Sequence, residues 1–286
     1  NVLPEIAKET CFALHGGTAI NLFVRNMPRL SVDIDLTYIP IENRVDTLQS
    51  ITEALERIKS NIERIFPEVK IARQLDDLKL QISSNNAQIK IEVNQAMRGV
   101  IDRSKKMNLC EVAQNKFDVF CAIQVVPFEQ LYGGKICAAL DRQHPRDLFD
   151  VKYLLKSEGF TTQIKKGFLL CLLSSNRPLN EMLFPNFSDQ QLAMENQFEG
   201  MSNEPFNYQD FEEIREILIQ TIHENLTKKD KEFLLNFKNL TPDWSIYDFE
   251  RFPAVQWKLQ NLQKLKENNP KKHTGLYKLL KEKLDI

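Results

Sequence analysis

Apolar and polar positions alternate in several short segments of the first half of the chain. This period-two pattern runs from Ser31 to Ile39, from Leu78 to Ser83 and from Gln88 to Asn94. A fourth segment, Val119 to Val126, is rich in β-branched residues, which favour strands. Between the first two segments, the apolar residues from Asn43 to Phe66 recur at helical spacing. The first half is therefore predicted to mix strands with at least one long helix.

The second half of the chain has a different pattern. Pro127 and Pro145 each precede a segment with helical spacing, because proline is favoured in the first turn of a helix. These two predicted helices and the later amphipathic ones are Phe128–Leu140, Arg146–Lys156, Phe211–Leu226, Lys229–Phe237, Val255–Leu265 and Leu276–Leu284. We predict an α+β fold in which a mixed β-sheet flanked by helices occupies residues 1–126 and an all-helical domain occupies residues 127–286.

Composition narrows the class of protein without naming a function. Apolar residues make up 42% of the 286 positions, which is enough to fill a sizeable core. The 38 basic and 39 acidic side chains nearly cancel, so any surface that binds nucleic acid must be local. The last 29 residues, Lys258 to Ile286, carry eight lysines against three acidic residues, a local excess of five positive charges.

The chain shows none of the usual signs of secretion or membrane insertion. Its five cysteines are scattered and lack metal-ligand spacing, so we interpret them as reduced thiols. No apolar run is long enough to cross a bilayer, and no basic-then-apolar leader is present. We expect a cytoplasmic protein with no membrane association, although a chain that begins at Asn1 rather than Met leaves open the removal of a leader.

Two carboxylates stand out in the first predicted strand. Side chains alternate along a strand, so Asp33 and Asp35 project from one face while Val32, Ile34 and Leu36 turn to the core. Neighbouring negative charges are unfavourable unless a cation lies between them, and hard carboxylate oxygens suit Mg²⁺ that bridges triphosphate oxygens. The alternative is a solvated strand edge on which the two aspartates do nothing.

A glycine-rich turn lies just upstream of these aspartates. Gly16, Gly17 and Thr18 lead into a segment with helical spacing, Ala19 to Arg25. Such a turn exposes main-chain N–H groups at the start of a helix, where phosphate oxygens bind. A Gly-Gly pair alone is also typical of an ordinary tight turn. The immediate succession of turn, helix and Asp-x-Asp strand favours the phosphate site.

A third carboxylate comes from the segment around Glu92. On a strand, Glu92 shares a face with Lys90 and Asn94 and is opposite to the apolar residues. If this strand pairs beside Asp33 and Asp35, Glu92 becomes a third metal ligand or the group that orients an attacking hydroxyl. The alternative is a surface glutamate on an amphipathic strand.

The last candidate residues lie in the run from Glu129 to Asp150. Lys135 is a lone charge in a small and apolar helix, and Arg146 is suited to holding a phosphate with its planar guanidinium. Asp147 and Asp150 lie three residues apart on one helix face and could orient either of these cations. The alternative for the two aspartates is stabilisation of the first helical turn after Pro145.

These motifs together resemble a known family. His15-Gly-Gly-Thr-Ala, then Arg29-Leu-Ser-Val-Asp-Ile-Asp-Leu, and then Gly-Lys-Ile, Leu-Asp-Arg and Pro-Arg-Asp-Leu-Phe-Asp are similar to the motifs of the AbiEii abortive-infection toxins. These are DNA polymerase β-like nucleotidyltransferases and the toxin half of bacterial type IV toxin–antitoxin systems, which act in phage defence. The resemblance is clear from about residue 11 to residue 156.

The resemblance implies roles for individual residues. Gly16, Gly17 and Thr18 match the glycine motif that binds nucleotide, and Asp33 and Asp35 match the metal pair. Lys135 matches the nucleotide-binding lysine and Asp147 the late acidic position, whereas the family is looser at Glu92. The family further implies a helical domain that closes the active-site cleft, NMP transfer from an NTP to an acceptor such as RNA, for example a tRNA end, and a cognate antitoxin.

Two other functions stay open from the sequence. The first is a nucleotidyltransferase that acts on a small molecule such as an antibiotic. The second is a binding module with the same fold and a degenerate site, which acts through its helical half. Neither the motifs nor the family resemblance identifies the acceptor.

Overall fold

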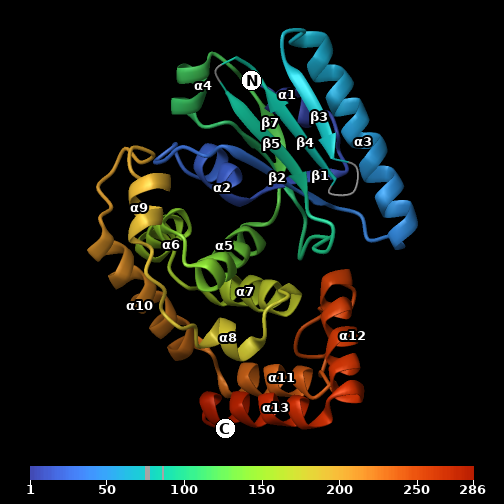
Figure 1. Cartoon of the computed structure of the whole chain (residues 1–286), viewed down its shortest axis with the longest axis vertical. Coiled ribbons are helices and arrows are strands. Elements are labelled where there is room, and N and C mark those ends of the chain that lie inside the picture. The colour runs from blue at the N-terminus through green and yellow to red at the C-terminus, as the bar shows by residue number, and fades with distance from the viewer. Residues whose placement is uncertain (75–77, 86) are drawn as a thin grey trace. The chain divides into compact units, whose positions relative to one another are not determined.

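The chain forms two compact units, and each unit is built from two separate stretches of the sequence. The computed structural model describes residues 1–74, 78–85 and 87–286 (Figure 1). Unit 1 comprises Asn1–Leu131 and Gly200–Pro205, and unit 2 comprises Tyr132–Glu199 and Phe206–Ile286. The chain therefore passes from one unit to the other at three points. No helix in the described ranges has the length and apolar character that spanning a membrane requires.

Unit 1 is built on a mixed sheet. Its strands are β1 (Phe12–His15), β2 (Asp33–Tyr38), β3 (Lys70–Gln74), β4 (Lys79–Ser83), β5 (Gln88–Val93), β6 (Lys105–Asn108) and β7 (Ala122–Val125), in the spatial order β3-β4-β5-β2-β1-β7-β6. Strand β2 runs antiparallel to β1 and parallel to β5. The central position of β2 places its residues between strands on both sides.

Alternation along β2 and β5 separates a buried face from a polar one. Ile34 and Leu36 in β2 and Ile91 in β5 are buried, while the intervening charged residues are half-buried. The long helix α3 (Arg44–Ile65) contacts β3 and β4 and the short helix α1 (Leu3–Ile6) through a stripe of buried aliphatic residues: Ile51, Leu55, Ile58 and Ile62. Because the aliphatic side chains of β2 point into the core, its charged side chains lie on the opposite, more accessible face.

Strand β2 is tied to a segment from the second half of the chain. The main-chain N–H of Leu30 donates to the carbonyl of Met201 at 2.8 Å, and that of Asn203 donates to the carbonyl of Pro28 at 3.0 Å. The main-chain groups just before β2 are bonded to this segment instead of to the sheet, so the strand begins only at Asp33. Val32, predicted to face the core, is instead 48% exposed because it lies outside the sheet.

Unit 2 is helical throughout its described residues. Its helices are α5 (Phe128–Arg142, whose first turn lies in unit 1), α6 (Pro145–Ser157), α7 (Thr162–Ser174), α8 (Leu179–Leu183), α9 (Gln191–Gln197), α10 (Tyr208–Asn225), α11 (Lys228–Lys238), α12 (Pro253–Asn268) and α13 (Pro270–Leu284). Helix α7 is the centre of this unit, with every residue from Phe168 to Leu173 buried.

The predicted α+β class is confirmed, as are the four predicted strands and seven predicted helices. The pattern missed other elements for physical reasons. Helix α7 is buried on almost all sides, so its sequence lacks the periodicity of an amphipathic helix. Strands β1 and β6 have four residues each and helix α4 (Glu111–Phe117) has seven. Segments this short do not show a recognisable hydrophobic period.

Candidate active site

The glycine-rich turn packs directly against the two aspartates of β2. Gly16 begins helix α2 (Gly16–Ala19) with φ of +70°, a conformation that side chains other than glycine rarely adopt. A Cβ at this position would collide with the carboxylate of Asp35. The glycine thus allows the turn and the Asp35 side chain to lie in contact. The helix continues without a break into a π-helical turn, η1 (Ile20–Val24).

Thr18 fixes the same turn to Asp33. Its hydroxyl donates to the main-chain carbonyl of Asp33 and lies 3.1 Å from the hydroxyl of Ser31. Thr18 is buried, so in this structure its hydroxyl holds the turn to the strand. A Cβ on Gly17 would lie 2.9 Å from a guanidinium nitrogen of Arg29, which is itself buried. Arg29 is therefore a direct neighbour of the turn. The sequence motifs gave no reason to assign a role to Arg29.

The predicted neighbour of the aspartates, Glu92, lies in the adjacent strand. Parallel pairing of β2 and β5 sets Asp35 opposite Glu92 and Asp33 opposite Lys90. The condition that the sequence left open, that these two strands pair, is thus met. The side chains that alternate to one face of the two strands carry three carboxylates and one ammonium group.

Lysines lie among these carboxylates. Lys90 Nζ is 3.0 Å from Glu92 Oε2 and 4.0 Å from Asp33 Oδ1, and Lys79 Nζ of β4 is 3.5 Å from Glu92 Oε1. The hydrogen bond to Glu92, together with the charges of Asp33 and Asp35, raises the pKa of Lys90 against the opposing effect of burial. Lys90 is thus a fixed positive charge in the place where a cation was expected.

The carboxylates do not form a three-ligand metal cage in this arrangement. Across residues 1–74, 78–85 and 87–286, no group of three or more His, Cys, Asp or Glu side chains is placed to hold a metal ion. Glu92 is held by two lysines, whereas Asp33 is 43% exposed and open to ligands. The oxygen donors that would fit a hard cation are the carboxylates of Asp33 and Asp35.

The remaining predicted residues form a second cluster, in unit 2. Lys135 of α5 is buried, and its Nζ lies 2.8 Å from Asp147 Oδ1 and 3.0 Å from Asp150 Oδ2 of α6. Arg142, at the end of α5, donates to both oxygens of Asp147 at 2.6 and 3.0 Å. The two aspartates therefore orient Lys135, as one of the two predicted alternatives had it. The arginine that pairs with Asp147 is Arg142.

Charge pairing determines the protonation of this buried cluster. Burial by itself would raise the pKa of Asp147, but the charges of Lys135 and Arg142 outweigh it and hold that pKa well below its usual range. Asp147 is thus ionised at every physiological pH. Arg142 was missed as a partner because it lies seven residues from Lys135 along α5, and only the bend between α5 and α6 brings both to one carboxylate.

The start of α6 is held by a histidine. His144 caps the helix, because its Nδ1 accepts from the main-chain N–H of Arg146 at 3.1 Å while its Nε2 lies 3.0 Å from Gln197 Oε1. Burial lowers the pKa of His144, which keeps the ring neutral and its Nδ1 lone pair available. Asp147, in the first turn, also stabilises the helix start, so the capping alternative and the orienting role both apply to it.

Helix α5 approaches α7 closely beside Lys135. A Cβ on Gly133 would collide with the main chain of Gly167 and Phe168. A glycine is therefore required where the two helices touch, two residues from the buried lysine. This close contact fixes the depth at which Lys135 lies in the unit.

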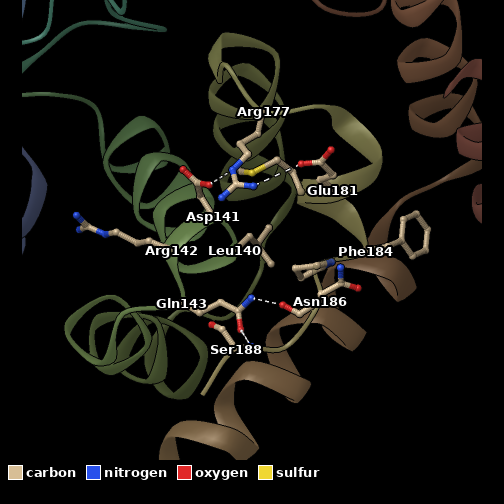
Figure 2. Close-up of a pocket in the computed structure, with 11 residues that line it drawn as sticks. Leu140, Asp141, Arg142, Gln143, Arg177, Glu181, Phe184, Asn186 and Ser188 are labelled. Carbon is tan, nitrogen blue, oxygen red and sulfur yellow. Dashed lines mark hydrogen bonds and ion pairs between the residues drawn. The ribbon is translucent and has the colours of Figure 1, made fainter. Parts of the chain in front are cut away.

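A cavity of about 510 Å³ opens on the other side of the end of α5. Figure 2 shows Arg142 extending away from Phe184 and Asn186, while Asp141 pairs with Arg177, 2.5 Å away, and Arg177 with Glu181. Several polar groups of this cavity pair with one another, and of the residues in the Lys135 cluster only Arg142 lines its wall.

Comparison with known proteins decides the family. The model of the AbiEii family, described as a nucleotidyl transferase AbiEii toxin of a type IV toxin–antitoxin system, matches residues 1–261. The chain belongs to this family of nucleotidyltransferase toxins. No curated protein matches the chain at a significant level.

A solved structure agrees with this assignment at the level of the fold. The nucleotidyltransferase toxin MenT4 from Mycobacterium tuberculosis H37Rv superposes with a TM-score of 0.62 over 91% of this chain and 89% of MenT4, at 14% sequence identity. At so low an identity the likeness shows a shared fold and carries no residue roles. The AbiEii match, which contains both clusters described above, identifies the enzyme class.

Proposed function

We propose that this AbiEii toxin transfers a nucleoside monophosphate from an NTP to an acceptor hydroxyl in a Mg²⁺-dependent reaction. The observation that carries the proposal is the contact between the glycine turn and β2: Gly16 lies against the Asp35 carboxylate, and Thr18 is bonded to the main chain of Asp33. A phosphate-binding turn and a hard-cation ligand pair thus share one place in the fold.

Asp33 and Asp35 are the residues that would hold the metal ion. They fit Mg²⁺ because they offer hard oxygens from one strand face, about 7 Å apart along the backbone. The chemistry supplied there by a bound Mg²⁺ is neutralisation of the triphosphate charge and polarisation of the phosphorus under attack. Gly16 and Gly17 contribute main-chain N–H groups toward the phosphates, and Thr18 positions the turn.

Lys90 and Glu92 would change partners as substrate binds. Lys90 now compensates the charge of Asp33 and Glu92, so a cation at the aspartates would release its ammonium group toward the triphosphate. Glu92 would then receive the proton of the attacking hydroxyl. The oxygen of the acceptor bonds to the α-phosphorus, the bond to the β-phosphate oxygen breaks, and pyrophosphate leaves.

The Lys135 cluster is proposed as the nucleotide-binding part of the helical domain. Asp147 and Asp150 hold the Lys135 ammonium in one orientation, and Asp147 is the catalytic acidic position of the late motif. Arg146, at the first turn of α6, would bind a phosphate oxygen. In this proposal, residues 127–286 close over the catalytic domain of residues 1–126.

The acceptor is proposed to be RNA such as a tRNA end. This assignment rests on the family, whose members are toxins and therefore act on something that the cell needs. The same membership supports neutralisation by a cognate antitoxin protein, a role in phage defence and action in the cytoplasm. Growth inhibition without resistance to an antibiotic would separate this function from transfer to a small molecule.

The ion pairs of Glu92 favour one alternative, a degenerate module that binds without transfer. Glu92 is held by Lys79 and Lys90 and is not free to serve as a metal ligand in this arrangement. Calorimetry with Mg²⁺ and a non-hydrolysable NTP distinguishes the two functions. An active site binds both ligands together, whereas a degenerate site binds the NTP weakly and independently of Mg²⁺.

The decisive experiment follows labelled nucleotide onto RNA extracted from cells. Asp33→Asn and Asp35→Asn should each reduce transfer by about a hundredfold or more, because each removes a charged oxygen that stabilises the transition state. Asp118→Asn is the matched control. Asp118 is exposed and has a φ of +47°, which asparagine also tolerates. Undiminished transfer by the two β2 variants would overturn the proposal.

A further inference from the structure

The end of α12 and the first part of α13 carry a concentrated positive charge. We call this surface the basic corner and define it by five exposed lysines, Lys264, Lys266, Lys271, Lys272 and Lys278. It lies at the C-terminal end of the chain, drawn in red in Figure 1. The chain as a whole has a net charge of −1, so this concentration is a local property.

Helix α13 turns its basic face away from its own unit. Leu280 and Leu284 on its opposite face are buried, and the buried His273 bonds to the carbonyl of Lys238 in α11 at 3.0 Å. These contacts fix the orientation of the helix. The lysines are therefore held outward by packing on the other side.

The lysines of the basic corner are not neutralised by the protein. Some lysines elsewhere pair with acids, as Lys152 does with Asp210 at 3.2 Å. In the part of the chain that the structure describes, no ion pair involves any of the five lysines of the corner. The ammonium group of Lys264 lies over the ring of Trp257, and Lys272 bonds to Asn269 through its main-chain N–H only. Their charge is thus available to a ligand.

The surface between these lysines is hollowed. Lys271, Thr274, Gly275 and Lys278 lie on one helix face and, with Pro270, line a shallow cavity of about 410 Å³. Gly275 lies inside α13, where glycine weakens a helix relative to alanine, and a Cβ there would meet nothing within 4 Å. Packing within the protein gives no reason for this glycine, but close approach of a ligand does.

The form of the surface selects a polyanion. Lys271 and Lys278 are two helical turns apart, about 10.5 Å along the axis, which suits two separate phosphates of one strand better than one compact anion. Protein interfaces deplete lysine at their centres, so a face composed of lysine, threonine and glycine is a poor protein-docking surface. Phosphate contacts dominate the affinity of proteins for nucleic acid.

We infer that the basic corner binds the phosphate backbone of the RNA acceptor. The inference rests on the proposed RNA-directed transfer and adds to it a docking surface distinct from the two residue clusters of the candidate active site. Helix α13 lies beyond residue 261, where the family match ends, so the surface is a feature of this chain outside the matched region.

The test compares two charge-neutralised variants of the full chain. Lys271→Gln/Lys278→Gln removes two charges from the basic corner, and Lys156→Gln/Lys166→Gln removes two from exposed positions on α6 and α7. The dissociation constant for end-labelled bulk tRNA is measured over a range of salt concentrations. The corner variant should show a slope of log K against log salt that is shallower by about 1.5, since each lost phosphate contact reduces it by about 0.7–0.9.

A second variant tests the hollow without changing charge. Gly275→Leu should weaken tRNA binding severalfold while raising the midpoint of thermal unfolding, because leucine is a better helix former than glycine and a Cβ at this position meets nothing within 4 Å. Higher stability with weaker binding cannot be explained by misfolding. Unchanged binding by this variant would count against a close approach of RNA at Gly275.

The outcomes for docking and for catalysis can be separated. If wild-type protein labels RNA but the corner variant keeps the salt slope of the control variant, the docking inference is overturned and the proposed function stands. If tRNA binding is lost only in the corner variant while wild type transfers no nucleotide, the docking surface stands and the proposed function is overturned. Equal binding of an acidic protein such as casein and of tRNA by wild type would also overturn a surface specific for RNA.

Discussion

At the scale of single residues, the buried charges of this toxin are the positions where one substitution should have a large effect on stability. Lys135 and Asp147 are both almost completely buried, and each compensates the other. Removing one partner of such a pair leaves an uncompensated charge in a medium that solvates it poorly. The cluster is therefore a structural requirement as well as a candidate nucleotide site.

Asp147→Asn should lower the free energy of unfolding by about 3 kcal/mol or more, because it leaves Lys135 with a single charged partner and removes the bidentate pair with Arg142. Asp141→Asn is the control. Asp141 pairs with Arg177 at the surface, where such a pair contributes about 1 kcal/mol or less. Urea denaturation of both variants measures the difference, and equal losses would show that burial of the pair is not decisive.

At the scale of elements, the turn from β1 into α2 is tightly constrained by the positive φ of Gly16 and its contact with Asp35. Gly16→Ala should cost about 1 kcal/mol for its positive φ and should in addition displace the Asp35 carboxylate, which lowers nucleotide transfer. Gly200→Ala has nearly the same φ, +77°, and open space around it, so it should carry only the backbone cost. Transfer assays with both proteins, corrected for the folded fraction, distinguish the two effects.

The first turn of α6 should respond to pH through His144. The folded state lowers the pKa of His144, so the neutral ring stabilises the protein above the unfolded value of about 6.5. This contribution is lost as the pH falls through the folded pKa. His144→Gln should cost about 1 kcal/mol near pH 8, in the range of a lost helix cap.

The difference between wild type and His144→Gln should narrow as the pH falls below the unfolded value of about 6.5, because protonation removes the cap from wild type as well. The comparison isolates this residue, since the shift that burial imposes on His223 is present in both proteins. Denaturation curves at several pH values measure the gap, and a gap that is constant with pH would exclude this role.

At the scale of the whole molecule, the return of Gly200–Pro205 to unit 1 links the second half of the chain to the segment that leads into β2. Asn203→Pro removes the N–H that bonds to Pro28, so the segment leading to Asp33 loses an anchor. We expect lower nucleotide transfer together with an unchanged melting curve by tryptophan fluorescence, since Trp244 and Trp257 both lie in unit 2. Asn203→Ala keeps the main-chain bond to Pro28 and loses only the longer side-chain bond to the Met27 carbonyl, at 3.3 Å, so it should transfer much closer to the wild-type rate.

The sequence by itself determined the α+β class, the strand that bears Asp33 and Asp35, and the turn beside it. These features are local: alternation along a strand and glycine before a helix are properties of adjacent residues. Only the tertiary structure decided that β5 pairs with β2, that Lys79 and Lys90 hold Glu92, and that Arg142 shares Asp147 with Lys135. Those contacts depend on which strands and helices become neighbours, and that is set by packing of the whole core, which no local period records.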